Sequence, residues 1–199
     1  MKIILSTRNP SKAEQIRAIF TGSSFTILTL DDAGIVGEGI EDGVSLEENA
    51  FKKARFSHDQ SKGVWTMADD TGLFINHLDG APGIKAARWA GENASTNEIT
   101  IHTLKKLKGA LDRSARFETV VALISPEGKA YYFSGKIWGI ILESPKTKPQ
   151  PKMPYSGIFM PDQTNKVWAE MTTNEENLIS HRGKAFREAR AFLESLPKN

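Results

Sequence analysis

Acidic side chains that could hold a divalent cation gather at two places in the sequence. Asp69 and Asp70 follow an apolar segment, and Glu38, Glu41 and Asp42 lie in an earlier glycine-rich stretch. The chain has no cysteine, and no histidine lies beside these carboxylates, so a metal there would have only oxygen ligands. Magnesium bound to a phosphate substrate prefers such ligands. The alternative for Asp69 to Gly72 is an ordinary turn, because Asp-Asp-Thr-Gly is turn-forming in its own right.

Cationic side chains that suit phosphate occur on two expected helices. Ser45 and Glu48 have the spacing of a capping box, which predicts a helix over 45–58. Asn49 and Lys53 lie one turn apart on it, and a lysine held there could act as a point charge on phosphate. The alternative is a solvated helix face. The segment 180–182, Ser-His-Arg, opens the last helix, where it could contact a ligand or form an ordinary cap.

The N-terminal segment predicts a strand, a tight turn and a helix. Lys2 to Ser6 is mostly apolar, Asn9 can cap a helix, and Pro10 suits its first position. Such a turn presents backbone N–H groups at a helix N-terminus, an arrangement that suits an anion.

The remaining pattern predicts a mixed sheet flanked by helices, an α/β fold, because strands and helices alternate early and hairpins dominate late. The expected strands are 25–30, 64–68, 72–78, 117–124 and 131–142, the expected loops are 31–43 and 144–154, and the later helices are 95–108 and 183–196.

Length and charge limit the possible functions. The chain has 199 residues, which suits a single domain over 1–199. Its 26 lysines and arginines against 24 acids leave a net charge of +2, so we expect neither a nucleic acid nor a membrane as partner. The N-terminal apolar run is too short for a signal peptide, and no apolar stretch approaches the roughly 20 residues of a membrane helix. We therefore expect a soluble, cytoplasmic protein.

In combination and order, several segments resemble the inosine triphosphate pyrophosphatase family, the house-cleaning enzymes that remove deaminated purine nucleotides. The resemblance spans nearly the whole chain, and the Asp-Asp and Gly-Ala-Pro-Gly segments in tandem are highly specific. The matching segments are Ser6 to Glu14, Ser45 to Ala54, Ala68 to Leu73, Gly80 to Gly91 and Ile179 to Gly183.

The resemblance implies hydrolysis of nucleoside triphosphates such as ITP, dITP or XTP to monophosphate and pyrophosphate. It implies an elongated mixed sheet with the nucleotide in a cleft between two lobes, Mg²⁺ as cofactor, and a homodimer. Thr7, Asn9, Lys12 and Lys53 would hold the triphosphate, with Thr71 at the place of a phosphate-contacting serine. Glu41 and Asp70 would bind magnesium, Asp69 would assist, and Asp70 would also activate the attacking water. His181 and Arg182 would meet the base.

Departures from the family pattern fall mainly on the base-binding part. The family's Gly-Tyr-Asp-Pro stretch appears as Pro154, Tyr155, Ser156 and Gly157, after a lysine- and proline-rich loop. Glu176 stands where many members carry a lysine that donates towards the purine 6-oxo group, so a donor has become an acceptor. Arg8 replaces a common glycine and could be an extra phosphate contact.

These departures leave alternatives open for the substrate. Base selectivity could have moved towards an amine-bearing base, or Glu176 could point to solvent while the lysine-rich loop rebuilds the pocket. Two further alternatives are a pyrophosphatase for pyrimidine or modified nucleotides, and a nucleotide-binding protein without catalysis.

Overall fold

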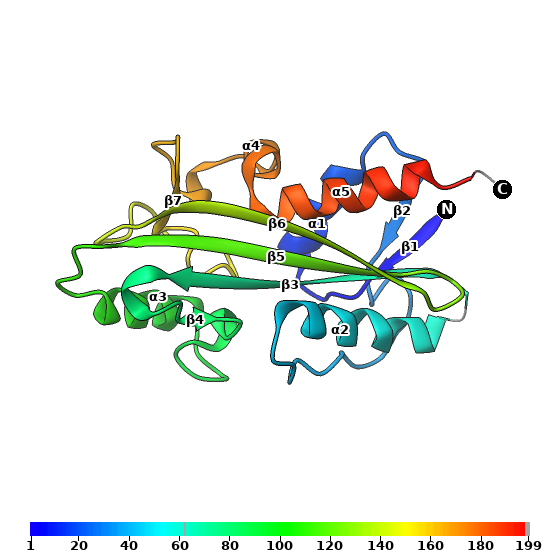
Figure 1. Ribbon diagram of the computed structural model, residues 1–199, viewed down its shortest axis with the longest axis horizontal. Helices are drawn as coiled ribbons and strands as arrows, with labels where there is room; N and C mark the ends of the chain where they lie inside the picture. The colour runs from blue at the N-terminus through cyan, green and yellow to red at the C-terminus, as the bar shows by residue number, and fades with distance from the viewer. Residues whose placement is uncertain (62, 198–199) are drawn as a thin grey trace. The chain divides into compact units, whose positions relative to one another are not determined.

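The computed structural model describes residues 1–61 and 63–197 (Figure 1). The strands are β1 (Lys2–Leu5), β2 (Thr26–Leu28), β3 (Trp65–Ile75), β4 (Pro82–Gly83), β5 (Ser114–Ile124), β6 (Ala130–Ile141) and β7 (Phe159–Pro161). The helices are α1 (Pro10–Phe20), α2 (Leu46–Ser61), α3 (Thr96–Lys106), α4 (Thr173–Ile179) and α5 (His181–Ser195). Among the described residues, no helix combines the length and the apolar character needed to span a membrane.

The strands form one mixed sheet, as the sequence pattern predicted. Their order is β2-β1-β3-β5-β6-β7, with β4 paired to β3 outside this path. β1 runs parallel to both β2 and β3, whereas β3 with β4 and β6 with β7 are antiparallel. β5 and β6 are joined by the predicted hairpin, in which the Gly128 amide donates to the Ser125 carbonyl at 2.9 Å.

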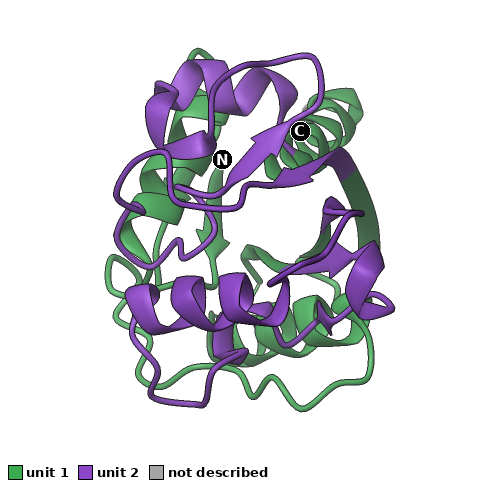
Figure 2. Ribbon diagram, turned by 90° about the vertical axis from the view of Figure 1, so that its left-hand side faces the viewer, with its two compact units in different colours: residues 1–70, 119–135, 181–199 green, residues 71–118, 136–180 purple. Residues whose placement is uncertain are grey.

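The chain divides into two compact units, each assembled from separate segments (Figure 2). Unit 1 contains Met1–Asp70, Thr119–Gly135 and His181–Asn199, and unit 2 contains Thr71–Glu118 and Lys136–Ser180. β3, β5 and β6 contribute residues to both. The single domain over 1–199 and the nucleotide cleft between two lobes stay predictions.

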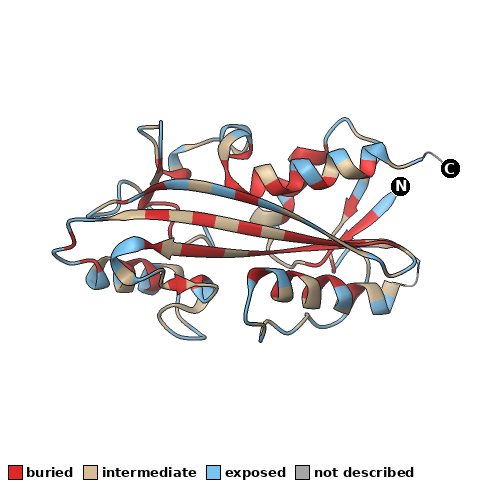
Figure 3. Ribbon diagram, viewed as in Figure 1, coloured by how far each residue is buried: buried red, intermediate tan, exposed pale blue. Residues whose placement is uncertain are grey.

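In unit 1, helices cover both faces of the parallel strands. α1 and α5 lie on one face, and α2 lies on the other (Figure 1). Met67 packs in the core that α1 and α5 cover, whereas its neighbour Ala68 packs in the core below α2. Successive strand residues point to opposite faces, so the parity of each β3 residue decides which helices it meets. Figure 3 shows how continuously β3 is buried.

The two crossover connections of unit 1 place their strands on opposite sides of β1. β1 leads through α1 to β2 on one side, and the chain returns through α2 to β3 on the other side of β1. In open parallel sheets, such a reversal of strand order places ligands beyond the carboxyl ends of the strands. In unit 1 this point lies just after Leu5, where β1 ends opposite Met67.

The predicted turn at Asp69 to Gly72 is wrong, and so is the separate strand over 72–78. β3 runs without interruption from Trp65 to Ile75. Gly72 serves close packing there, since a Cβ atom would come within 2.8 Å of the Phe74 ring and 3.1 Å of the Gly83 carbonyl oxygen. The local turn preference is overridden, because cations on the helices that cover the two faces of the sheet pair with the two aspartates.

The predicted helices are present with small differences at their ends. Asn9 caps α1 with Pro10 in its first turn, as predicted, and Ser95 caps α3 at the start of the predicted helix 95–108. α2 extends three residues beyond the predicted end at His58, and α5 begins two residues before the predicted start at Gly183. Ser45 accepts the Glu48 amide, but Glu48 accepts the Val44 amide instead of closing the box on Ser45.

Candidate active site

Asp69 and Asp70 carry the candidate site on one buried strand. Both side chains are almost fully buried, at 2% and 7% exposure. Because they are neighbours in β3, they point to opposite faces: Asp69 towards α1 and α5, and Asp70 towards α2. They lie just past the end of β1, so no strand residue of β1 pairs beside them.

On the first face, Asp69 pairs with two cations. Lys12 Nζ lies 3.1 Å from Asp69 Oδ1, and Arg182 Nε lies 3.4 Å from Asp69 Oδ2. The cap of α1 places Lys12, because Asn9 Oδ1 accepts the Lys12 amide at 3.3 Å. Arg182 stands in the first turn of α5 and also donates to the buried Gln15 Oε1 at 2.7 Å. Asp69 therefore joins α1, β3 and α5.

Asp69 is held as a carboxylate despite its burial. Burial acts to raise its pKa, but Lys12, Arg182 and Lys53 together hold the pKa of Asp69 well below the ordinary 3.8. Burial lowers the pKa of Lys12, although Asp69 opposes the shift. Because both groups are buried, the ion pair of Lys12 and Asp69 is stabilised chiefly by the attraction between its two charges and not by hydration.

On the second face, Lys53 lies between two carboxylates. Its Nζ donates to Asp70 Oδ1 at 2.9 Å and to Glu41 Oε1 at 2.7 Å. One helical turn earlier, Asn49 Nδ2 donates to Asp70 Oδ2 at 3.2 Å. Asn49 and Lys53 are 1% and 9% exposed, so the alternative of a solvated helix face is wrong for these two residues. Lys52 instead forms the surface pair with Glu48 at 2.7 Å.

The environment of Asp70 differs from that of Asp69. Burial raises the pKa of Asp70 above 3.8, because Lys53 does not fully compensate for the lost hydration. Burial acts to lower the pKa of Lys53, but Asp70 and Glu41 raise it overall. Two neighbouring carboxylates therefore have pKa values shifted in opposite directions, a pattern that marks candidate acid–base sites.

The side chains on both faces form one cluster of three cations and three carboxylates. Lys53 influences the pKa of Asp69, and Lys12 influences that of Asp70, although the two lysines come from helices on opposite faces. The charged cluster consists of Lys12, Glu41, Lys53, Asp69, Asp70 and Arg182. The structure thus brings together every residue expected to bind metal or assist catalysis, all in unit 1.

The turn between β1 and α1 lies beside this cluster, but Arg8 is engaged elsewhere. Thr7 Oγ1 accepts the Asn9 amide at 3.2 Å. The Arg8 guanidinium holds the following loop: Nε contacts Asp31 at 3.0 Å and Nη2 donates to the Ile35 carbonyl at 2.6 Å. Glu38 contacts Arg8 at 3.5 Å, whereas Glu41 pairs with Lys53 and is the acid of that loop in the cluster. A phosphate contact by Arg8 stays a prediction.

His181 opens α5 next to Arg182 and is 3% exposed. Burial lowers the pKa of His181 well below its ordinary 6.5, and the neighbouring Arg182 lowers it further. The imidazole is therefore neutral at pH 7 and can both donate and accept a hydrogen bond.

The predicted base-contacting residues of unit 2 have structural contacts of their own. Tyr155 donates to the Ala86 carbonyl at 2.8 Å, and its ring packs edge-on against Phe117. Ser156 Oγ accepts the Gln150 amide at 2.7 Å and donates to the Met153 carbonyl at 2.8 Å, which closes the lysine-rich loop. Both side chains thus stabilise unit 2, and their contact with a base stays a prediction.

Glu176 and Thr71 complete the predicted set. Glu176 is 6% exposed in α4, so the alternative in which it points to solvent is wrong. Thr71 follows Asp70 in β3 and is half-buried. Sequence reasoning missed Gln15, the acceptor of Arg182; its position one turn after Lys12 in α1 was the available signal.

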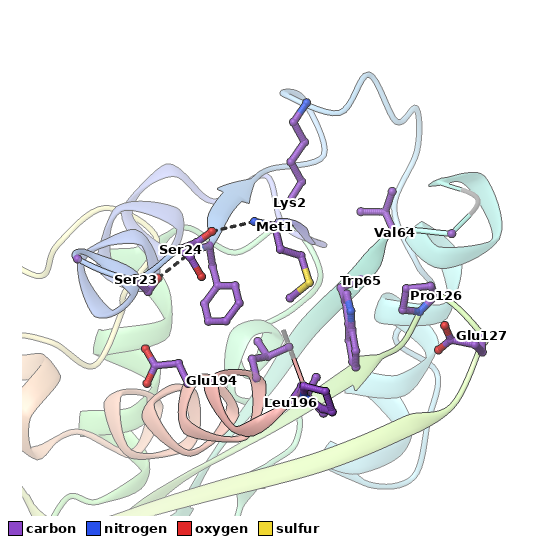
Figure 4. A pocket seen from close by; sticks show the side chains of 15 residues that line it. Met1, Lys2, Ser23, Ser24, Val64, Trp65, Pro126, Glu127, Glu194 and Leu196 are labelled. Carbon is purple, nitrogen blue, oxygen red and sulfur yellow. Dashed lines mark hydrogen bonds between the residues drawn. The ribbon is translucent and has the colours of Figure 1, made fainter. Parts of the chain in front are cut away.

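A separate cavity of about 1230 Å³ lies in unit 1 at the amino ends of β1 and β3 (Figure 4). Its wall includes Lys2, Phe25, Trp65, Glu127 and Glu194. No residue of the charged cluster lines it, since the cluster lies beyond the carboxyl end of β1.

Comparison with known proteins identifies relatives along nearly the whole chain. The profile of the Ham1 family matches residues 3–192. The dITP/XTP pyrophosphatase of Thermoanaerobacter sp. (strain X514) is 40% identical over 195 residues, which cover 97% of this chain and 96% of that protein. The dITP/XTP pyrophosphatase of Geobacter sulfurreducens is 39% identical over 186 residues, 92% of each chain.

Solved structures give the same result. A HAM1 protein from Coxiella burnetii superposes with a TM-score of 0.85 at 30% identity and covers 98% of this chain and 100% of that one. The Ham1 protein of Staphylococcus aureus superposes with a TM-score of 0.83 at 29% identity and covers 98% of both chains. The predicted fold class and family resemblance are confirmed.

Replacing Asp69 with Asn tests the charge balance of the cluster. We expect the variant to lose about 3 kcal/mol of unfolding free energy at pH 7, because Lys12 and Arg182 lose a buried partner. The folded-state pKa of Asp69 is lowered, so its contribution is fully present well above pH 3.8 and declines as the pH falls below that value. Denaturant unfolding at pH 7 and pH 3 should therefore show a smaller difference at pH 3.

The exposed Asp59→Asn change is the matched control, since Asp59 pairs with Arg55 at the surface. We expect it to cost less than about 1 kcal/mol. A gap between wild type and Asp69→Asn that stays constant down to pH 3, or widens, would contradict the assigned pKa direction.

Proposed function

The chain belongs to the Ham1 family, and on this premise we propose that it hydrolyses deaminated purine nucleoside triphosphates, such as dITP and XTP, to monophosphate and pyrophosphate. The observation that carries the proposal is the charged cluster, which gathers carboxylates for a metal and lysines for phosphate around one buried strand. Phosphoryl transfer needs charge neutralisation and alignment more than covalent chemistry, and these side chains can supply both. The names of the relatives support the choice of base.

We assign the triphosphate to Lys12, Lys53 and the turn between β1 and α1. In the structure Lys12 pairs with Asp69 and Lys53 pairs with Asp70. Each lysine could exchange its carboxylate partner for a phosphate oxygen and keep an anionic partner throughout. Thr7 and Asn9 would add polar groups at the N-terminus of α1, which favours anions. Thr71 would add a hydroxyl next to Asp70.

The carboxylates of Glu41 and Asp70 fit Mg²⁺. Both lie within hydrogen-bond distance of the same ammonium group, so their oxygens already surround one cationic position. Among the described residues, no group of three or more acidic, histidine or cysteine side chains could hold a metal. A pair suits magnesium, which is often bound by one or two carboxylates together with substrate phosphates. When bound, Mg²⁺ would neutralise phosphate charge and lower the pKa of a coordinated water.

We assign Asp70 as the group that accepts a proton from the attacking water. The Asp70 carboxylate contacts the same ammonium group as Glu41, so it can accept a proton beside the position proposed for the metal. Asp69 stays ionised and would keep Lys12 and Arg182 oriented. This division of roles follows from the two faces of β3.

For the base, we propose His181 and Arg182 as contacts. A neutral imidazole can act as donor to a 6-oxo group, and the Arg182 guanidinium carries several N–H donors. We include Tyr155 and Ser156 in the same proposal, because they lie in the segment that corresponds to the family's Gly-Tyr-Asp-Pro stretch. We also propose that the protein forms a homodimer, as the resemblance implies.

A second candidate function is hydrolysis with a preference for an amine-bearing base. It is favoured by the burial of Glu176, a carboxylate acceptor at a place where many family members have a lysine donor. An ionised carboxylate accepts hydrogen bonds and cannot donate one to the 6-oxo group of inosine, whereas an exocyclic amine could donate to it.

Replacing Asp70 with Asn tests the catalytic assignment. We expect pyrophosphate release from dITP to fall about 100-fold or more, because the amide cannot accept the proton and binds metal weakly. Circular dichroism should stay unchanged. Asp162→Asn, a change at an exposed aspartate, should keep wild-type turnover. Unchanged turnover in Asp70→Asn would remove Asp70 from the mechanism, and an inactive wild type would favour a nucleotide-binding protein without catalysis.

A substrate panel separates the two candidate functions. Steady-state kcat/KM should be measured for dITP, XTP, dATP, dCTP and dGTP on the wild type and on Glu176→Gln. The proposed function predicts that dITP or XTP exceeds the amine-bearing nucleotides by about tenfold or more. The second candidate predicts that the amine-bearing nucleotides have the higher kcat/KM in the wild type. It also predicts that Glu176→Gln, which supplies an amide donor, shifts the preference towards dITP.

A further inference from the structure

The loop that carries Glu41 lies directly against α2 at two glycines. A Cβ atom on Gly39 would come within 2.7 Å of Lys53 Cα, and one on Gly43 within 2.7 Å of Asn49 Oδ1. Neither position has room for a side chain. Glu41 lies midway between these contact points, so the position of its backbone relative to the helix is fixed on both sides.

Asn49 uses both ends of its amide at this junction. Its Oδ1 accepts the Gly43 amide at 2.8 Å, and its Nδ2 donates to Asp70 Oδ2 at 3.2 Å. The side chain is 1% exposed, so water does not compete for these partners. A single side chain thus connects the loop of Glu41 to the carboxylate of Asp70.

The two oxygens of Asp70 have different donors from one helix. Lys53 holds Oδ1, and Asn49, one turn earlier, holds Oδ2. A carboxylate held at both oxygens cannot rotate about its terminal torsion without losing a bond. If Lys53 turns towards phosphate, Asn49 is the donor that still fixes this plane.

We propose that Asn49 is a positioning residue that holds Asp70 and the loop of Glu41 in register for magnesium and water. The inference rests on the proposed function. Partners that orient metal-binding carboxylates commonly change metal affinity or activity by about 10- to 100-fold when removed. Asn49 acts through Asp70 and Gly43 and makes no contact of its own with the reacting atoms.

Two substitutions separate the two ends of the amide. Asn49→Ala removes both bonds. Asn49→Asp keeps an oxygen for the Gly43 amide but, when ionised, has no hydrogen to donate to Asp70. Asn97→Ala, on the exposed face of α3, is the control.

The first readout is hydrogen exchange at the Gly43 amide, measured without metal or nucleotide. We expect exchange to accelerate at least about tenfold in Asn49→Ala and to stay near the wild-type rate in Asn49→Asp and Asn97→Ala. The second readout is the kinetics with dITP and Mg²⁺. Both Asn49 variants should lower kcat by about 10- to 100-fold, with a rise in the Mg²⁺ concentration for half-maximal rate and little change in KM for dITP.

A kcat within about twofold of wild type in Asn49→Asp would overturn the positioning role, and so would equal losses in Asn97→Ala. If Asn49→Ala does not fold, Asn49→Asp, which preserves shape and volume, still decides. Wild-type protein that releases no pyrophosphate from any nucleotide would refute the proposed function; normal wild-type turnover with unaffected Asn49 variants would refute this inference alone.

Discussion

Two adjacent carboxylates inside a continuous strand must be compensated by cations, and this requirement organises the structure of unit 1. Desolvating an unpaired carboxylate costs several kcal/mol, so Asp69 and Asp70 are tolerated only with their partners in place. Those partners come from three helices: Lys12 from α1, Lys53 from α2 and Arg182 from α5. The same charges that the proposed chemistry requires thus link the three helices to the strand.

Successive side chains of a strand point to opposite faces, so the two carboxylates have different surroundings. Asp69 meets two cations and is kept ionised, whereas Asp70 meets one lysine and an amide, which do not offset its burial, so its pKa is raised. Because β1 ends at Leu5, the two faces can still influence each other beyond its end. A triphosphate is therefore expected where the strand order reverses, between an ionised anchor and a more basic neighbour.

Sequence reasoning predicted the parts of this arrangement that depend on local spacing. Asn9 with Pro10, and Asn49 with Lys53 on one helix face, follow from rules that hold within one helix. It failed at Asp69 to Gly72, where turn-forming residues continue a strand because distant cations neutralise them. It also could not find Gln15 or the close contacts of Gly39 and Gly43, since these depend on which elements pack together.

We propose that the charged cluster directs water to one linkage of a deaminated purine nucleoside triphosphate. The most direct test is to identify every product of dITP incubated with wild-type protein and Mg²⁺ by anion-exchange chromatography. We expect dIMP and pyrophosphate in equal amounts, with no dIDP or inorganic phosphate. Formation of dIDP and inorganic phosphate, or no turnover of any nucleotide, would contradict it.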